Sequence, residues 1–242
     1  MDKLSNPFSL LALEDDDDPS NLSSTSATSN TRKKGRKGVI SSDKLSVDNG
    51  NNKEQKLGLT VKECKSPLVW IDLEMTGLNI EVDRILEIAC IITDGSLSKS
   101  VEGPDFVIHQ SQECLDKMNE WCQINHGASG LTKKALHSKV DEREAEKQVI
   151  EFVRRHVGDN HTPLLAGNSV YTDYIFLKKY MPDLARIFPH VLVDVSSVKA
   201  LCDRWYPKVS RKAPAKKSKH RALEDIRESI RELKYYKDNI FI

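Results

Sequence analysis

The chain has 242 residues, with 37 Lys and Arg against 36 Asp and Glu, and is 38% hydrophobic and 30% charged. These values are typical of one globular domain with a tail, and they exclude a collagenous or wholly disordered chain. A membrane-spanning chain is also excluded, because Glu87 interrupts the richest apolar run (residues 85–93) and a spanning helix needs roughly 18 apolar residues.

Residues 1–66 differ in composition from the rest of the chain. Ser, Asn, Lys and Asp predominate there, and Phe8 is the one aromatic residue before Pro67. Such a segment buries too little apolar surface to offset its ordering entropy, so we expect a largely disordered, low-complexity tail. Its acidic run at 14–18 and basic cluster at 32–37 indicate solvated charge patches, in preference to a nuclear address or an RNA-attracting arm. Residues 67–242 are long enough for one well-buried core.

Strands are expected in the first part of this domain. Residues 68–75 are apolar and β-branched around two acids and stop at Thr76-Gly77, and residues 85–93 form a second apolar run. A turn at Gly95-Ser96 leads to a third strand at 106–109. The short connections predict a three-strand antiparallel meander.

Helices and strands then alternate. An amphipathic helix is predicted at 141–157, because Ala145, Val149, Phe152 and Val153 share one side. Further strands are expected at 163–166 and 191–194. Further helices are expected at 172–181, stopped by Pro182, at 196–205, and at 222–237 after a basic loop. This order predicts an α/β fold, a mixed sheet covered by helices.

Asp72 and Glu74 lie two apart in the first strand, so their side chains point to the same face. Two like charges in a mostly apolar strand are costly unless cations neutralise them, and hard divalent metals suit carboxylates. The alternative is an edge strand whose acids face solvent.

Three later residues fall where such a site would need them. Asp173 lies in the first turn of a helix after a short strand, although the helix dipole alone would favour an acid there. Asp225 lies on the last helix about 100° from the core position Ile226. His220 precedes that helix and, taken singly, is interpreted as a surface residue of the basic loop.

Together these positions resemble the DEDDh exonucleases of the ribonuclease H-like fold. Within that group the chain is similar to the oligoribonuclease family, in the strings WIDLEMTGL (70–78), GNS (167–169), KYMP (179–182) and DIRES (225–229). The resemblance covers residues 67–242 and none of the tail.

This resemblance implies a 3′-to-5′ exoribonuclease that converts very short single-stranded RNA, from dinucleotides upward, to 5′-mononucleotides. The four carboxylates would bind two Mg²⁺ or Mn²⁺ ions, and His220 would be the general base. A DEDDh exonuclease acting on single-stranded DNA and a non-catalytic nucleic-acid-binding module are the alternatives. The second needs a lost metal ligand, and all five catalytic positions are filled.

Substrate-binding positions carry over from the same resemblance. Leu78 matches a residue that wedges between terminal bases, although it suits a core equally well. Trp121 and His126 match a nucleotide pocket, although Trp121 taken alone is interpreted as a core residue. Ser169 and Ser196 match hydroxyls that contact the 5′ phosphate of a dinucleotide. Six cations are expected to attract phosphates, unless they form a solvated charge run: Arg211, Lys212, Lys216, Lys217, Lys219 and Arg221.

The family also implies a homodimer, and one segment departs from its pattern. His190 and Val191 stand where the family usually has a Tyr and an Arg that reach the partner subunit's site. Val cannot replace the charged contact of an Arg. The departure leaves the role of the dimer in reading substrate length open.

The five cysteines, at positions 64, 90, 114, 122 and 202, indicate a reducing compartment. They are odd in number and form no C-x-x-C pair, which argues against a disulfide framework and a zinc ribbon. We expect a cytoplasmic protein, with mitochondria and the nucleus as alternatives. The first twenty residues are too acidic for a typical mitochondrial transit peptide and lack the apolar segment of a signal peptide.

Overall fold

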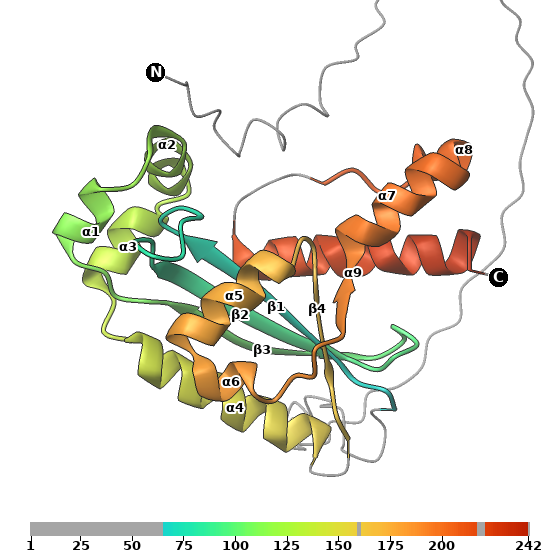
Figure 1. Cartoon of the computed structure of the whole chain (residues 1–242), viewed down its shortest axis with the longest axis horizontal. Helices are drawn as coiled ribbons and strands as arrows, with labels where there is room; N and C mark the ends of the chain where they lie inside the picture. Colours follow the sequence, from blue (N-terminus) through green and yellow to red (C-terminus); the bar gives the residue numbers. More distant parts are fainter. Residues whose placement is uncertain (1–64, 159–160, 217–220, 242) are drawn as a thin grey trace, which may run out of the picture. The chain divides into compact units, whose positions relative to one another are not determined.

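The computed structural model describes residues 65–158, 161–216 and 221–241, which contain a five-stranded sheet in the order β3-β2-β1-β4-β5 (Figure 1). The first three strands, β1 (Leu68–Met75), β2 (Ile85–Thr93) and β3 (Ser100–Val107), pair antiparallel. β4 (Leu164–Gly167) runs parallel to β1, and β5 (Leu192–Asp194) runs parallel to β4. The predicted mixed α/β sheet is therefore confirmed.

The third strand differs from its expected position. β3 begins at Ser100 and ends at Val107, whereas the sequence suggested 106–109. All eight of its residues are exposed or half-buried, and it contains Gly103 and Pro104, so it lacks an apolar run. Proline is tolerated on an edge strand, where one row of backbone groups has no partner in the sheet.

Four of the helices match their predicted positions closely. They are α4 (Glu142–Val157), α5 (Tyr171–Tyr180), α7 (Val195–Trp205) and α9 (Ala222–Asn239). Pro182 ends α5 as expected, but it also begins the short helix α6 (Pro182–Ala185), since proline suits a first helical position. In the same way α8 (Pro207–Ser210) occupies the start of the segment expected to be a basic loop.

Three further helices between β3 and α4 had not been predicted: α1 (Gln112–Asp116), α2 (Glu120–Ala128) and α3 (Leu131–His137). They are too short to show a clear apolar stripe. The local signals of α1 and α2 are their caps, because Ser111 and Asn119 accept hydrogen bonds from Cys114 N and Cys122 N. They lie together beyond one end of the sheet (Figure 1).

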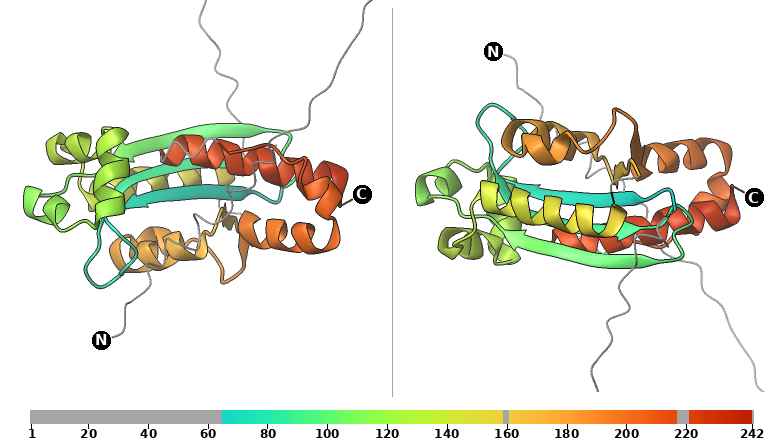
Figure 2. Two further views of the ribbon diagram at one scale, coloured as in Figure 1. Left: turned by 90° about the horizontal axis from the view of Figure 1, so that it is seen from above. Right: turned by 90° about the horizontal axis from the view of Figure 1, so that it is seen from below.

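The two faces of β1 contribute to different clusters of buried side chains. Val69, Ile71 and Leu73 belong to the larger cluster, which contains residues of α4, α5 and α6. Trp70 packs with residues of α9 such as Ile226 on the other face. The sheet accordingly lies between α4 and α9 (Figure 2). Because strand side chains alternate, Asp72 and Glu74 share the face of Trp70 and point to the side that α9 covers.

β1 is a central strand, between β2 and β4. The alternative of an edge strand with solvent-facing acids is therefore wrong. The described cysteines, at 90, 114, 122 and 202, are free, while Cys64 lies outside the described ranges. No helix within those ranges is both long and apolar enough to cross a membrane.

Candidate active site

Three of the predicted carboxylates meet at the end of β1. Asp72, Glu74 and Asp225 each offer an oxygen atom, and these atoms all lie within 4.8 Å of one another. β1 supplies the first two, and the first turn of α9 supplies Asp225 from the helix that covers this face. Glu74 is buried, and the other two are half-buried. Such an oxygen donor set suits a hard divalent cation.

Asp173 is joined to the same strand by a backbone contact. β4 pairs with β1 only as far as Trp70, so the backbone of Leu73 has no partner in β4. Leu73 N instead donates a 2.9 Å hydrogen bond to Asp173 Oδ1, which comes from the first turn of α5. This bond satisfies a buried amide and orients the Asp173 carboxylate beside Asp72.

Burial and the charges of neighbouring acids raise the pKa values of all four carboxyls. Burial, followed by the charges of Asp173, Glu74 and Asp225, raises the pKa of Asp72 well above its usual value. Burial is also the main cause for the others, and raises the pKa of Glu74 to about 8, of Asp173 to about 7 and of Asp225 to about 6. Because burial makes it unfavourable to ionise these four acids, a bound cation would stabilise their charged forms.

The raised pKa values predict how stability changes with pH. The ordinary pKa of Glu74 is 4.5, and its pKa in the folded state is about 8. Between these two pH values the folded protein keeps a proton on Glu74 that the unfolded chain has released. Its contribution to the free energy of unfolding is therefore full below 4.5 and is lost as the pH rises through about 8. We expect the Tm in chelator to fall from about pH 5 to about pH 8, and Mg²⁺ to raise it more at the higher pH.

The control for this measurement is Glu74→Gln, which cannot lose a proton. Its Tm in chelator should depend less on pH over the same interval, because one of the titrating groups is gone. An equal pH dependence in the two proteins would contradict the assignment of Glu74 as a buried, repelled carboxyl.

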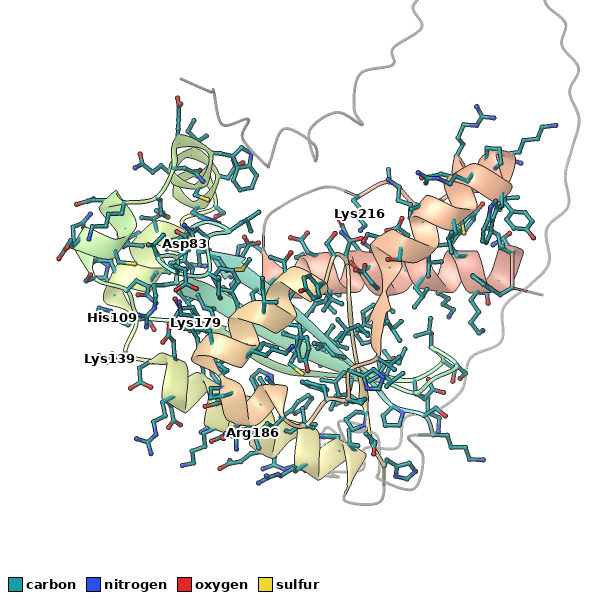
Figure 3. The ribbon with its side chains drawn as sticks, viewed as in Figure 1. Asp83, His109, Lys139, Lys179, Arg186 and Lys216 are labelled. Atoms are coloured by element: carbon teal, nitrogen blue, oxygen red, sulfur yellow. The ribbon has the colours of Figure 1, made fainter. Side chains whose placement is uncertain are left out.

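The loop after β1 carries Leu78, which is half-buried. Asp83 closes this loop by accepting hydrogen bonds from Thr76 Oγ1 (2.9 Å) and Asn79 N (2.8 Å). The Tyr180 hydroxyl of α5 donates to the Asp83 carbonyl over 2.7 Å, and Lys179 Nζ reaches the Ile80 carbonyl over 2.6 Å (Figure 3). Lys179 and Tyr180 of the string KYMP thus fix the loop that carries Leu78.

Trp121 and His126 both lie on α2. Their ring centroids are 6.4 Å apart with a nearly perpendicular orientation. His126 is buried, and its Nε2 lies 2.9 Å from the Met75 carbonyl oxygen, so Nε2 carries the proton of that bond. His126 Nδ1 lies 3.9 Å from Glu74 Oε2. Of the predicted nucleotide-pocket pair, His126 is therefore adjacent to Glu74, and Trp121 lies beside His126.

Ser169 and Ser196 are connected through a residue that sequence reasoning had not singled out. Asp194 Oδ1 accepts hydrogen bonds from Ser169 N (2.9 Å), Ser196 N (2.9 Å) and Ser196 Oγ (2.7 Å). Its charge also contributes to the raised pKa of Asp173. Asp194 therefore joins Ser169 and Ser196, the two predicted phosphate contacts, and lies close to Asp173.

The basic segment before α9 is only partly described. His220, Lys217 and Lys219 lie outside the described residues. Arg211 and Lys212 are exposed, as the expected role of attracting phosphates requires. Lys216 instead forms an ion pair with the buried Glu232 of α9, with 2.9 Å between Nζ and Oε2 (Figure 3).

Arg221 also forms an ion pair, with the carboxylate of Glu87 in the apolar strand β2. Its guanidinium contacts both oxygens of Glu87, through Nε at 3.0 and 3.1 Å and through a terminal nitrogen at 2.6 Å. Glu87 is fully buried and lies directly opposite Glu74 in the β1–β2 pair. The one signal of this contact in the sequence was an acid interrupting the richest apolar run.

Known proteins are similar to this chain in sequence. Residues 69–233 match the RNase T family model, described as an exonuclease. The chain is 61% identical over 242 residues to an Arabidopsis thaliana protein named oligoribonuclease, covering 100% of this chain and 98% of that protein. It is 50% identical over 174 residues to human mitochondrial oligoribonuclease, covering 72% of this chain and 73% of the human one.

Solved structures share the fold. A complex of E. coli exonuclease I with a 5cy-dA13 oligonucleotide superposes with a TM-score of 0.55 at 15% identity, covering 72% of this chain and 41% of that one. A zinc-bound complex of the same enzyme with single-stranded DNA gives a TM-score of 0.59 at 14% identity, with 73% and 41% covered. This chain therefore spans about two fifths of those longer chains, and at these identities the likeness concerns the fold.

Proposed function

This chain belongs to the oligoribonuclease family of exonucleases, and from that premise we propose that it is a hydrolase that degrades very short RNA from the 3′ end. The observation that carries the proposal is the meeting of Asp72, Glu74 and Asp225 within 4.8 Å at the end of β1. Its products are 5′-mononucleotides.

The four carboxylates are proposed to hold two Mg²⁺ or Mn²⁺ ions. The donor set fits, since it consists of hard oxygen ligands whose shared burial raises the pKa of each carboxyl. When bound, such ions supply charge stabilisation for phosphodiester hydrolysis and lower the pKa of water. The hydrogen bond from Leu73 N would keep Asp173 aimed at them.

The remaining proposed roles belong to side chains around the acidic group. His220 takes the proton of the attacking water, because imidazole titrates near neutral pH. Trp121 stacks on a base beside His126, and Leu78 wedges against the terminal bases from the loop fixed by Tyr180. Ser169 and Ser196 contact the 5′ phosphate, with Asp194 setting the distance between them.

The decisive experiment is a time course of 5′-labelled RNAs of two to roughly ten nucleotides, with Mg²⁺ and with chelator. We expect metal-dependent release of mononucleotides, with the dinucleotide cleaved fastest. Matching DNA oligonucleotides form the second arm. Faster cleavage of DNA would favour the DNA exonuclease, and binding of RNA without any cleavage would favour a non-catalytic module.

We propose that the protein is a homodimer. Leu201 and Trp205 lie four residues apart on α7, so they share one face, and their exposed fractions are 43% and 66%. Tyr206, directly after them, is 47% exposed. Large aromatic side chains gathered at the surface are typical of protein interfaces.

Trp205→Ala is the test of this interface. We expect the variant to elute as a monomer in size-exclusion chromatography with light scattering, because truncating a central aromatic residue commonly costs about 2 kcal/mol or more. The matched control is Phe241→Ala, since Phe241 is 63% exposed beyond the end of α9. A wild-type protein that is already monomeric would refute the proposal.

We also propose that residues 67–242 form the exonuclease domain and that residues 1–66 are a tail outside it. The family match begins at residue 69, and the first strand begins at Leu68. Deleting residues 1–60 should therefore change kcat and KM for a dinucleotide by less than about twofold. A large loss of activity in the truncated protein would make the tail part of the fold or of the site.

For the compartment we propose the cytoplasm, on the strength of the free cysteines at 90, 114, 122 and 202. The human relative is named as mitochondrial, which makes mitochondria the main alternative. Imaging of the full chain fused to a fluorescent protein at its C-terminus distinguishes the two, together with the nucleus.

A further inference from the structure

The ion pair between Glu87 and Arg221 has no role in the function proposed above, and its location needs an explanation. Arg221 occupies the N-cap of α9, where its side chain makes no capping hydrogen bond. A cation at the positive end of the helix dipole is unfavourable. Glu87, for its part, is a fully buried carboxylate within the apolar strand β2. Neither residue suits its position unless the other is present.

Glu87 holds the start of α9 by its backbone as well as by the side chain of Arg221. Glu87 Oε2 accepts a hydrogen bond from Ala222 N over 3.2 Å, and so replaces the missing cap. The carbonyl of Arg221 in turn accepts the amides of Glu224 (3.0 Å) and Asp225 (3.1 Å). A continuous set of contacts therefore runs from the middle of β2 to the backbone of Asp225.

The same pair lies among the acids of the site. Glu87 and Glu74 are direct partners across the β1–β2 ladder, and like charges in that arrangement are destabilising. Arg221 offsets this repulsion, and its charge lowers the pKa of Glu74 against the effects of burial and of the other acids. Asp105 of β3 is a further acid in these surroundings: burial and then the charge of Glu87 raise its pKa, and the charge of Arg221 lowers it.

We propose that the Glu87–Arg221 ion pair is the positioning element of the metal site: it fixes the first turn of α9 on β2 and so holds Asp225 opposite Glu74 and Asp72. This inference rests on the function proposed above and assigns two residues that do not themselves contact metal or substrate. The planar, bidentate guanidinium is what the role requires, because it fixes direction as well as charge.

The structure offers a matched control on the same helix. Arg227 makes a similar bidentate ion pair with Glu102 of β3, at 2.9 Å from Nε to Oε1 and 2.7 Å from the terminal nitrogen to Oε2. That pair also ties α9 to the sheet, but its side chains are 37% and 50% exposed. Loss of this pair reports the effect of loosening α9 in general.

The experiment compares Arg221→Gln, Arg221→Lys and Arg227→Gln in the full chain. The first measurement is Mn²⁺ affinity by calorimetry, and the second is kcat and KM for an RNA dinucleotide at saturating Mn²⁺. We expect Arg221→Gln to weaken Mn²⁺ binding about 10- to 100-fold, as loss of a group that orients a metal ligand does. The same variant should lower kcat more than it changes KM. Arg221→Lys should lie between it and the wild type, and Arg227→Gln should match the wild type within about twofold.

Equal Mn²⁺ affinities in Arg221→Gln and Arg227→Gln would overturn the proposal. If Arg221→Gln fails to fold, because Glu87 is then buried without a partner, the double variant Arg221→Gln with Glu87→Gln replaces it. Weak Mn²⁺ binding by a folded double variant supports the positioning role, and wild-type affinity refutes it. The titration needs no substrate, so a wild-type protein that binds Mn²⁺ but cleaves no RNA would refute the proposed function alone.

Discussion

Replacing Asp72 with Asn is expected to lower kcat for dinucleotide hydrolysis by about a thousandfold or more. The substitution keeps the shape of the side chain but removes a ligand charge from the group formed with Glu74 and Asp225. Metal ions in such sites contribute several kcal/mol of charge stabilisation, and each 1.36 kcal/mol corresponds to about a factor of ten in rate. The loss should persist at saturating Mn²⁺.

The same substitution should stabilise the metal-free protein at about pH 8. Asp72 shares its surroundings with Asp173, Glu74 and Asp225, so removing one charge relieves repulsion among the others. The measurement is Tm in chelator, with Glu102→Gln as a control for a carboxylate on an exposed surface. Near wild-type hydrolysis by Asp72→Asn in Mn²⁺, or a lower Tm in chelator, would contradict the placement of Asp72 at the metal site.

His220→Ala should slow the chemical step by about 10² to 10⁴ while leaving Mn²⁺ affinity nearly unchanged. The reason is the difference between a proton acceptor and a ligand: an imidazole that accepts the proton of water contributes to kcat and not to metal binding. Calorimetry with Mn²⁺ and single-turnover kinetics separate the two roles.

His137→Ala is the matched control, since His137 is exposed at the end of α3. It should retain wild-type kcat. A loss of Mn²⁺ affinity in His220→Ala that equals the loss of rate would make His220 a ligand, and an unchanged rate would leave the general base unassigned.

The sequence was most informative where chemistry and periodicity coincide. Asp72 and Glu74 could be placed on one face of a strand because they lie two apart, and their burial followed from the apolar residues around them. Asp225 could be placed on a helix facing them because Ile226 marks the buried side. Local pattern therefore placed each acid on its strand or helix, and the resemblance to the DEDDh exonucleases predicted that they form one site.

Contacts between residues far apart in the chain could not be predicted in this way. Glu87 and Arg221 are 134 positions apart, and each taken alone is unfavourable in its own strand or helix. Asp194 was seen only as the end of a strand, because its three hydrogen bonds depend on how β4 and β5 are placed. The helices at 112–137 were missed since short helices depend on caps and packing more than on a stripe.

The shortness of β4 has a consequence for how the family can vary. The strand stops at Gly167, and the Leu73 amide that it leaves without a sheet partner is the donor that orients Asp173. Continued in the same register, the pairing would reach Leu73 three residues beyond Trp70, take that donor and displace the start of α5. Insertions and deletions in related genes should therefore accumulate at turns such as 95–99 and be purged between 167 and 171, where chain length itself is under selection.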